Sequence, residues 1–278
     1  AVTRVHAGDR VVGSFLIPCG ECWWCRRKEY NNCNNVSWRV LGYGSFFGDL
    51  QGAQAEKARV PMADLTLLAI GEELPDEQAV FVGDSLATAH YAASLAGIGE
   101  GDTVAVIGCG PVGLLTLQCC RRYRPGQLVA LDSVPERLVA AQGLGAIPID
   151  VSRRNPIVAV AERTEQRGAD AAIDCVGAES AFRSGLDMVR AGGHLVVVGV
   201  YVELEYPFPL GEAWRKNLRM TFSGVTPVMR IWGDVLAAVR EGELDPAAIV
   251  SHTLPLEEAE KGYELFDSRR ATQVVLRP

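Results

Sequence analysis

The 278-residue sequence lacks a long hydrophobic run, an excess of basic charge and any internal repeat. No apolar stretch reaches the roughly 18 residues that a membrane-spanning helix needs. The N-terminus has no basic region followed by an apolar one, so it does not resemble a signal peptide. With 27 basic and 34 acidic side chains, the net charge of −7 argues against a nucleic-acid partner. We therefore expect a cytoplasmic protein that binds neither membranes nor nucleic acids.

Cysteine, by contrast, is clustered. Four of the eight cysteines lie in the segment "CGECWWCRRKEYNNC", residues 19–33, with the spacing C-x2-C-x2-C-x7-C. Clustered cysteines in a reducing compartment are typical of metal sites, because disulfides are rare there. Four thiolates at this spacing can surround one Zn²⁺ tetrahedrally and leave no open coordination position. The predicted ligands of this structural zinc are Cys19, Cys22, Cys25 and Cys33.

An iron–sulfur cluster is the alternative for these cysteines. Its bacterial signature ends in C-x3-C-P, whereas here seven residues separate Cys25 from Cys33 and Asn34 follows. The residues between the cysteines are mostly polar or bulky and cannot build a core, so the metal would supply the folding energy of the lobe. We therefore favour structural zinc.

Near-continuous apolar runs alternate with segments of helical periodicity from residue 86 to about residue 222. Parallel strands read as continuous apolar runs because helices cover both faces of their sheet. The alternation predicts an α/β fold with a doubly wound parallel sheet. The expected strands are residues 103–108, 127–132, 146–151, 171–177 and 194–200. The C-terminal segment indicates one helix, 231–244, and one strand, 272–278.

The first strand of this region leads directly into "GCGPVG", residues 108–113. The pattern G-x-G-x-x-G between a strand and a helix is typical of dinucleotide-binding folds. Gly108 would allow the tight turn, Gly110 the approach of a pyrophosphate, and Gly113 close packing of helix and strand. Pro111 suits the first turn of the helix, where its missing N–H costs nothing, and the backbone N–H groups that follow, beginning with that of Val112, would be free for the phosphates. A ligand-free strand-turn-helix is the alternative.

The second strand ends at Asp132, 24 residues after Gly108. A carboxylate there can accept both ribose hydroxyls and would repel a 2′-phosphate, so NAD is favoured over NADP. Arg137 lies where it could flank the ribose. Later strands end near three valines, whose backbone would line the nicotinamide unless they are plain core residues. These are Val176, Val198 and Val200.

Taken together, these motifs resemble the zinc-containing alcohol dehydrogenases of the medium-chain dehydrogenase/reductase superfamily, along the whole chain. The matching segments are GDRVVGSFLIPCGECWWCRRKEYNNC, GDSLATAHYAA, VAVIGCGPVGLL, ALDSVPERL and DCVG. The resemblance implies a GroES-like, mostly β catalytic domain (1–85 and 223–278, with the zinc lobe 19–33) around an NAD-binding Rossmann domain (86–222). It also implies a homo-oligomer, either a dimer or a tetramer.

The segment GDSLATAHYAA implies two catalytic residues. In the family, the position of Asp84 carries a ligand of a second, catalytic zinc. Asp84 followed by Thr88 resembles the formaldehyde-dehydrogenase-like branch, in which Thr88 would touch the nicotinamide. Without the resemblance, Asp84 would be interpreted as the N-cap of a helix.

The resemblance also implies further zinc ligands upstream, a Cys and a Gly-His-Glu. No Cys precedes Cys19, and His6 lacks the neighbouring Gly and Glu, so we expect roughly the first eighty residues of a family member to be absent. Asp84 alone cannot hold a zinc with three protein ligands and an open position. The resulting hypothesis is an impaired, zinc-dependent oxidoreductase that transfers hydride between an alcohol, or an aldehyde hydrate, and NAD. The alternative is a non-catalytic NAD(H)- and zinc-binding module.

Overall fold

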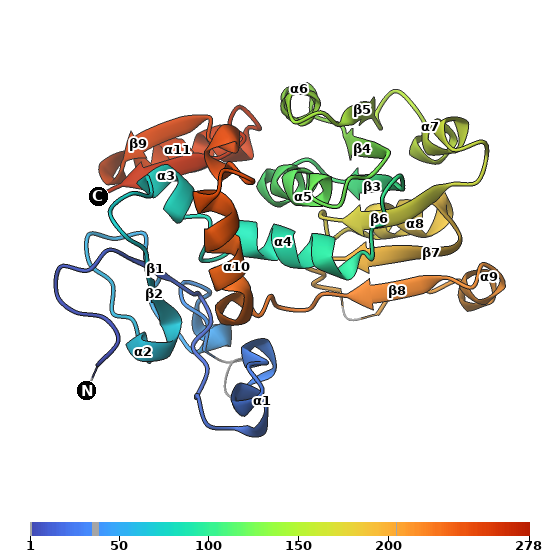
Figure 1. Cartoon of the computed structure of the whole chain (residues 1–278). Coiled ribbons are helices and arrows are strands. Elements are labelled where there is room, and N and C mark those ends of the chain that lie inside the picture. The colour runs from blue at the N-terminus through green and yellow to red at the C-terminus, as the bar shows by residue number, and fades with distance from the viewer. Residues whose placement is uncertain (1, 35–38, 204) are drawn as a thin grey trace. The chain divides into compact units, whose positions relative to one another are not determined.

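The computed structural model describes residues 2–34, 39–203 and 205–278, which form two compact units (Figure 1). The first unit combines Ala1–Ala87 with Val225–Pro278, and the second is the continuous stretch Thr88–Gly224. The second unit is thus inserted between two segments that pack together as the first.

The second unit is built on a six-stranded sheet in which every neighbouring pair is parallel, with the order β5-β4-β3-β6-β7-β8. The chain starts in the middle at β3, winds outward to β5, crosses to β6 and winds outward again to β8. The predicted α/β fold with a doubly wound parallel sheet is therefore confirmed. The strands are β3 (Thr103–Ile107), β4 (Gln127–Asp132), β5 (Ile147–Asp150), β6 (Ala169–Asp174), β7 (Val189–Val197) and β8 (Arg219–Phe222).

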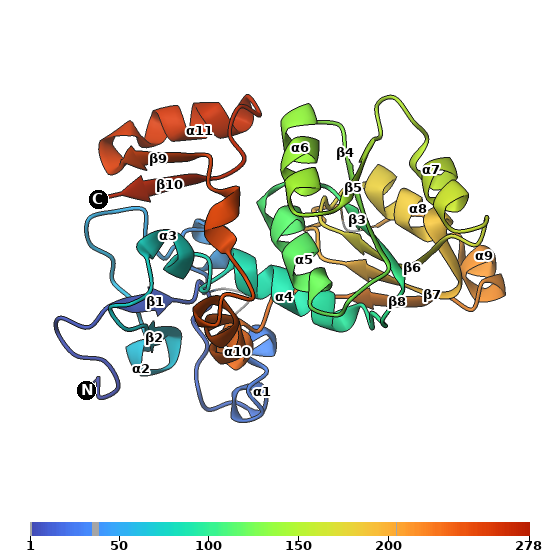
Figure 2. The same cartoon turned by 45° about the horizontal axis from the view of Figure 1, so that its top comes forward.

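Helices cover both faces of this sheet, with α5 and α6 on one face and α7 and α8 on the other (Figure 2). Three of these four helices begin at a proline, whose fixed φ and missing N–H suit the first helical position. The helices of this unit are α4 (Ser85–Leu95), α5 (Pro111–Arg121), α6 (Pro135–Gly143), α7 (Pro156–Arg163), α8 (Glu179–Met188) and α9 (Leu210–Arg215).

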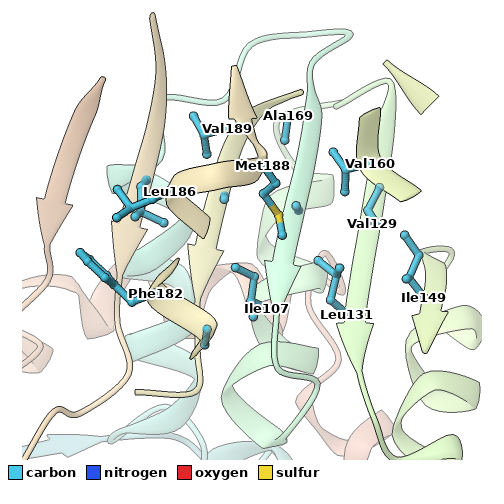
Figure 3. Packing of buried hydrophobic residues seen from close by; sticks show 14 of the residues in the cluster. Ile107, Val129, Leu131, Ile149, Val160, Ala169, Phe182, Leu186, Met188 and Val189 are labelled. Atoms are coloured by element: carbon cyan, nitrogen blue, oxygen red, sulfur yellow. The ribbon is translucent and has the colours of Figure 1, made fainter. Parts of the chain in front are cut away.

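The core of the second unit lies between the sheet and its helices. All five residues of β3 are buried, as are the last five of β4. Figure 3 shows side chains of both strands, Ile107 and Leu131, packed among residues of α7 and α8 such as Val160, Phe182 and Leu186. Burial on both faces explains why these strands read as continuous apolar runs.

The first unit has little regular structure. Strand β1 (Val11–Gly13) pairs with β2 (Leu67–Ala69) in antiparallel fashion, and β9 (His252–Pro255) pairs in parallel with β10 (Val274–Arg277). The α-helices are α1 (Trp23–Arg26), α2 (Ala63–Thr66), α3 (Asp76–Ala79), α10 (Val228–Arg240) and α11 (Ala259–Asp267), and the 3-10 helices include η1 (Tyr30–Asn32), η3 (Ser45–Phe47), η4 (Pro246–Ile249) and η5 (Leu256–Glu258).

The C-terminal segment holds more structure than its sequence indicates, because β9 and α11 join the predicted helix and strand. Helix α11 carries a glycine at its centre, Gly262, and a Cβ there would lie 3.2 Å from a side-chain atom of Val274 on β10. The glycine lowers the helical signal of the sequence and permits close packing. Within the described ranges, no helix has both the length and the apolar character to cross a bilayer.

Candidate functional site

The zinc lobe, residues 19–33, winds its four cysteines around one point. Cys22 occupies the position directly before α1, Cys25 lies within that helix, and Cys33 directly follows η1. Their Sγ atoms, with that of Cys19, all lie within 4.8 Å of one another. In the part of the chain that the structure describes, this is the one group of three or more clustered His, Cys, Asp or Glu ligand atoms.

The spacing of the sulfurs fits a tetrahedral zinc site. Zn–S bonds of about 2.3 Å place sulfurs about 3.8 Å apart at tetrahedral angles. The Sγ of Cys25 lies 3.9 Å from that of Cys19 and 3.5 Å from that of Cys22. The backbone N–H of Cys19 donates to Cys33 Sγ at 3.3 Å, and that of Cys22 donates to Cys19 Sγ at 3.4 Å. Such N–H donors stabilise thiolate ligands.

Backbone hydrogen bonds favour the thiolate forms of two cysteines in the lobe, and thiolates attract a cation. Hydrogen bonding from the backbone of Cys25 contributes most to lowering the pKa of Cys22, to about 6. The backbone of Glu21 contributes most to lowering the pKa of Cys19. Burial raises the pKa of Cys25. A bound divalent cation favours the thiolate form of every ligand, which offsets the cost of burying that thiolate.

A small apolar cluster supports the lobe, and the partly buried side chains of Phe15, Tyr30, Phe47 and Trp232 pack against it. Leu16, Val40 and Met229 are buried against Cys25 and Cys33. The aromatic residues Trp23 and Trp24 pack edge to face with ring centroids 4.6 Å apart, and the guanidinium of Arg27 lies 3.8 Å above the Trp23 ring. Trp23 is nevertheless 50% exposed, so these contacts cover the surface of the lobe and do not form a core.

The glycine turn, residues 108–113, connects the end of β3 to the start of α5. Gly108 has a φ of +86°, which L side chains rarely adopt. A Cβ on Gly113 would lie 1.8 Å from the carbonyl oxygen of Gly108. A Cβ on Gly110 would meet only Arg137 Nη1, at 4.0 Å. The outer glycines are thus required by packing, whereas Gly110 opens space in front of the N-terminus of α5.

That space suits a pyrophosphate. Helix α5 begins at Pro111 and has no side-chain cap at Gly110. Val112, in its first turn, is half-buried, as is Pro111. Free backbone N–H groups and the helix dipole at such an end attract phosphate oxygens.

Asp132 ends β4 beside the glycine turn and is 8% exposed. Its Oδ2 accepts a hydrogen bond from the Cys109 N–H at 2.7 Å. Its Oδ1 accepts from the N–H groups of Ser133 and Val134 at 2.7 and 2.9 Å. A carboxylate offers about four acceptor sites, so these three bonds fix its orientation and leave capacity for a ribose hydroxyl.

Arg137, in α6, lies at the same place. Its Nη1 is 3.9 Å from Asp132 Oδ2, and only 20% of its side chain is exposed. Its Nε is buried and has no hydrogen-bond partner among the described residues. An orphaned buried donor near an open glycine turn is what a bound phosphate or sugar would satisfy.

The three valines predicted near the nicotinamide follow β6 and β7. Val176 is 50% exposed and Val200 is 82% exposed, whereas Val198 is half-buried. A Cβ on Gly108 would lie 2.5 Å from Val176 Cγ2, so the segment after β6 is packed against the glycine turn. Residues 108–113, 176 and 198–200 therefore follow three adjacent strands at one edge of the sheet.

Two polar residues of this edge were not predicted from the sequence. Asp174 is fully buried at the end of β6, and the hydroxyl of Tyr201 donates to its Oδ2 at 2.6 Å. The motif DCVG contains Asp174, but only the pairing of β6 with β7 brings Tyr201 to it.

Asp84 and Thr88 lie at the start of α4. Asp84 directly precedes Ser85, the first residue of that helix, and Thr88 lies in its first turn. Asp84 is exposed. The pKa of Tyr43 is raised, first by the burial of Tyr43 itself and second by the negative charge of Asp84. Among the described residues, Asp84 does not join a cluster of three potential metal ligands.

The comparisons with known proteins cover both units. Residues 111–240 match the family described as zinc-binding dehydrogenase, and residues 1–70 match the alcohol dehydrogenase GroES-like domain. AdhB, a zinc-type alcohol dehydrogenase-like protein of Bacillus subtilis, is 34% identical over 307 residues, which cover 100% of this chain and 81% of AdhB.

Solved structures agree with this result. Alcohol dehydrogenase TADH from Thermus sp. ATN1 is 43% identical with a TM-score of 0.94, over 98% of this chain and 80% of that protein. A candidate zinc-binding dehydrogenase from Sinorhizobium meliloti, bound to NADP, is 25% identical with a TM-score of 0.85, over 100% of this chain and 79% of that protein.

Proposed function

Because the chain belongs to the zinc-type alcohol dehydrogenases of the medium-chain dehydrogenase/reductase superfamily, we propose that it holds one structural zinc and binds NAD(H). The reaction that this cofactor would serve is hydride transfer from an alcohol, or an aldehyde hydrate. The observation that carries the proposal is the glycine turn, with an open space at Gly110 and a fixed carboxylate at Asp132 beside it.

The proposed cofactor site uses residues 108–113 for the pyrophosphate and Asp132 with Arg137 for the adenosine ribose. The backbone of Val176, Val198 and Val200 would face the nicotinamide. When bound, NAD⁺ accepts the hydride. Asp132 supports NAD over NADP, because its buried charge would repel a 2′-phosphate. The NADP in the Sinorhizobium meliloti relative makes this preference worth measuring.

The proposed division of labour assigns residues 1–85 and 223–278 to the catalytic domain and 86–222 to the cofactor domain. Within the first, Cys19, Cys22, Cys25 and Cys33 would hold the structural zinc, whose coordination leaves no open position for substrate.

We further propose that Asp84 is a ligand of a catalytic zinc and that Thr88 orients the nicotinamide, as in the formaldehyde-dehydrogenase-like branch. The described residues by themselves do not complete such a zinc site, because Asp84 does not belong to any group of three or more potential metal ligands among them. The sequence also contains no Gly-His-Glu. We therefore expect the 278-residue chain, assayed as it is, to turn over alcohols slowly or not at all.

The second candidate function is a non-catalytic module that binds NAD(H) and one zinc. The described residues contain a four-cysteine group and an open glycine turn but no group of three potential metal ligands that includes Asp84, and this contrast favours the module.

One experiment separates the two candidates. Zinc content, NADH binding and NAD⁺-dependent oxidation of alcohols and of formaldehyde are measured on the same purified sample. One zinc per chain with saturable NADH binding and no turnover supports the module. Two zincs with turnover support the enzyme. A chain that binds no NADH contradicts both.

We also propose that the chain forms a homo-oligomer through the outer end of the second unit. Strand β8 is an edge of the sheet. Phe222, on β8, is 62% exposed, and Trp214, in the helix α9 that precedes β8 in the chain, is 83% exposed. Multi-angle light scattering should give a mass of two or four chains, and Trp214→Glu should lower it, whereas a monomeric wild type would contradict the proposal.

A further inference from the structure

A fully buried carboxylate, Asp174, joins two segments at the nicotinamide side of the sheet edge. Its Oδ1 accepts hydrogen bonds from the N–H groups of Val176 and Gly177, at 2.8 and 3.3 Å. Its backbone carbonyl accepts from the N–H groups of Val198 and Gly199, both at 2.9 Å. One residue thus fixes the segment after β6 and the segment after β7.

The two segments also touch directly. Gly177 has a φ of +79°, and a Cβ on it would lie 2.4 Å from the carbonyl oxygen of Val200. A Cβ on Gly199 would lie 2.0 Å from the backbone nitrogen of Gly177. A small shift of either segment therefore moves the other, and the backbone of both depends on the bonds that Asp174 makes.

Tyr201 completes the arrangement. Its hydroxyl lies 2.6 Å from Asp174 Oδ2 and 2.9 Å from the Ala178 carbonyl oxygen, and its one proton is shared between these two acceptors, of which the carboxylate oxygen is the nearer. Its ring packs edge to face on Phe182, with centroids 6.2 Å apart. Burial raises the pKa of Tyr201, and so does the bond to Asp174, which keeps the hydroxyl protonated as a donor. A hydrogen bond to a buried carboxylate is among the strong ones in proteins.

Asp174 and Tyr201 lie on the side of the sheet edge where the nicotinamide half of the cofactor would bind. In a doubly wound sheet the dinucleotide crosses the switch point between the two innermost strands, here β3 and β6. Asp132, on β4, lies on the adenosine side of that point. The segments that Asp174 joins follow β6 and β7, on the other side, where the nicotinamide would lie.

We propose that Asp174 and Tyr201 are positioning residues for the nicotinamide half of the dinucleotide. They hold the segments 175–178 and 198–201 in register, so that the backbone around Val176, Val198 and Val200 meets the nicotinamide as one surface. The inference rests on the proposed function, since it supposes that a dinucleotide binds at this edge. It predicts that loss of the pair weakens ligands that carry nicotinamide and spares those that do not.

The test compares two probes, NADH and ADP-ribose, which lacks the nicotinamide, on the zinc-loaded full chain. In Tyr201→Phe the ring stays and the hydroxyl is lost. Dissociation constants from calorimetry should rise about tenfold for NADH, the effect of one charge-assisted hydrogen bond, and less than about twofold for ADP-ribose. The emission maximum of bound NADH should also shift toward that of free NADH.

Tyr206→Phe is the matched control. The Tyr206 ring also packs edge to face on Phe182, at 5.4 Å, but its hydroxyl makes no hydrogen bond with the described residues. Both dissociation constants should stay within about twofold of wild type. Asp174→Asn, which keeps one acceptor oxygen, serves as the second variant should Tyr201→Phe fold poorly. It should weaken NADH about tenfold and ADP-ribose less than about twofold. Where Tyr201→Phe does fold, adding it to Asp174→Asn should cost less than about a further twofold, because the two residues share one hydrogen bond.

The outcomes are distinct. If Tyr201→Phe and Asp174→Asn bind NADH as wild type does, or if NADH and ADP-ribose weaken equally, the positioning inference is wrong while the proposed function stands. If wild type binds neither ligand, the proposed function fails and the inference fails with it.

Discussion

The zinc lobe and the glycine turn bring their residues together by opposite means. In the lobe, four sulfurs meet within 4.8 Å beside a small apolar cluster that includes Leu16 and Met229. In the turn, the strands β3 and β4 are buried in a large core that fixes the backbone. We expect the lobe to depend on its metal for folding, whereas the larger core around β3 and β4 fixes the backbone of the turn, which would need its ligand only to function.

The difference also appears in what each site contributes. The lobe supplies side chains and places them at metal distances. The turn instead leaves space by lacking side chains, since a Cβ on Gly110 would meet only Arg137. A binding site can thus be made by adding ligand side chains where the core is small, or by leaving out side-chain atoms where a large core fixes the backbone.

The largest expected effect is the loss of a zinc ligand. A structural zinc contributes about 10–16 kcal/mol in zinc-finger peptides. Shared over four thiolates this is about 2.5–4 kcal/mol each, or roughly 70-fold to 800-fold in affinity. Cys25→Ser should therefore lose most of its zinc and the ordered structure of the lobe, while the sheet stays folded. Metal analysis and competition with a chromophoric chelator measure the affinity.

Cys120→Ala is the control for that prediction. Cys120 is fully buried in α5, far along the chain from the lobe, so its removal should leave one zinc per chain. If Cys25→Ser kept its zinc with wild-type affinity, Cys25 would not be a zinc ligand. The contrast between a metal-dependent lobe and a core-supported turn would then be wrong.

The second prediction concerns the turn. In Gly113→Ala, the added Cβ would lie 1.8 Å from the Gly108 carbonyl oxygen, so β3 and α5 must separate. Overpacking of this kind should cost about 3 kcal/mol of unfolding free energy and abolish NADH binding, with zinc content unchanged. Urea unfolding followed by circular dichroism measures the first effect.

Gly143→Ala, at another helical glycine, is the matched control. Nothing lies within 4 Å of a Cβ at Gly143, so the change should alter stability by no more than about 1 kcal/mol, in the stabilising direction. Equal effects of the two substitutions would show that close packing does not explain Gly113.

Both sites could be predicted from the sequence because their signals are local. The order G-x-G-x-x-G and the acid 24 residues after Gly108 are local signals, and both lie where predicted, at the ends of β3 and β4. The cysteine cluster is also a local signal, within fifteen residues. Patterns set by near neighbours in the chain can thus be recognised in the amino-acid sequence alone.

The Asp174–Tyr201 contact could not be predicted in this way. The two residues are 27 positions apart and meet because Asp174 pairs with Val197 at the ends of β6 and β7. The register of a parallel pair depends on the packing of the whole sheet, which no local pattern specifies. The strand β9 was not predicted for a related reason, since its short sequence HTLP carries only half-buried or exposed residues and a proline.

The third prediction tests the carboxylate of the turn. Asp132→Asn removes the charge, and NADH should bind about tenfold more weakly, while NADPH should bind more tightly than to wild type. Calorimetry with both ligands measures the change. Asp150→Asn is the control, because Asp150 lies opposite Asp132 on β5 and bonds Ser152 instead. Unchanged affinities for both cofactors in Asp132→Asn would contradict its role.

The smallest expected effect concerns pH. Burial and the charge of Arg219 lower the pKa of His194, which lies in β7 and contacts Thr221 at 2.9 Å. The unfolded state then binds the proton more readily, so the unfolding free energy of the sheet should fall as pH drops through about 6.5. The slope should not exceed about 1.4 kcal/mol per pH unit.

His194→Gln should flatten that slope below about pH 6.5, as measured by urea unfolding at several pH values. His6→Gln, at a side chain 76% exposed, should leave the slope unchanged. An undiminished slope in His194→Gln would assign the pH dependence of the sheet to another group.

Calorimetric titration of the zinc-loaded chain with NADH at two temperatures tests the central claim most directly. The account predicts saturable binding of one NADH per chain, with an enthalpy that becomes more negative on warming as apolar surface is buried. No binding heat at either temperature, from a sample that holds one zinc per chain, would contradict it.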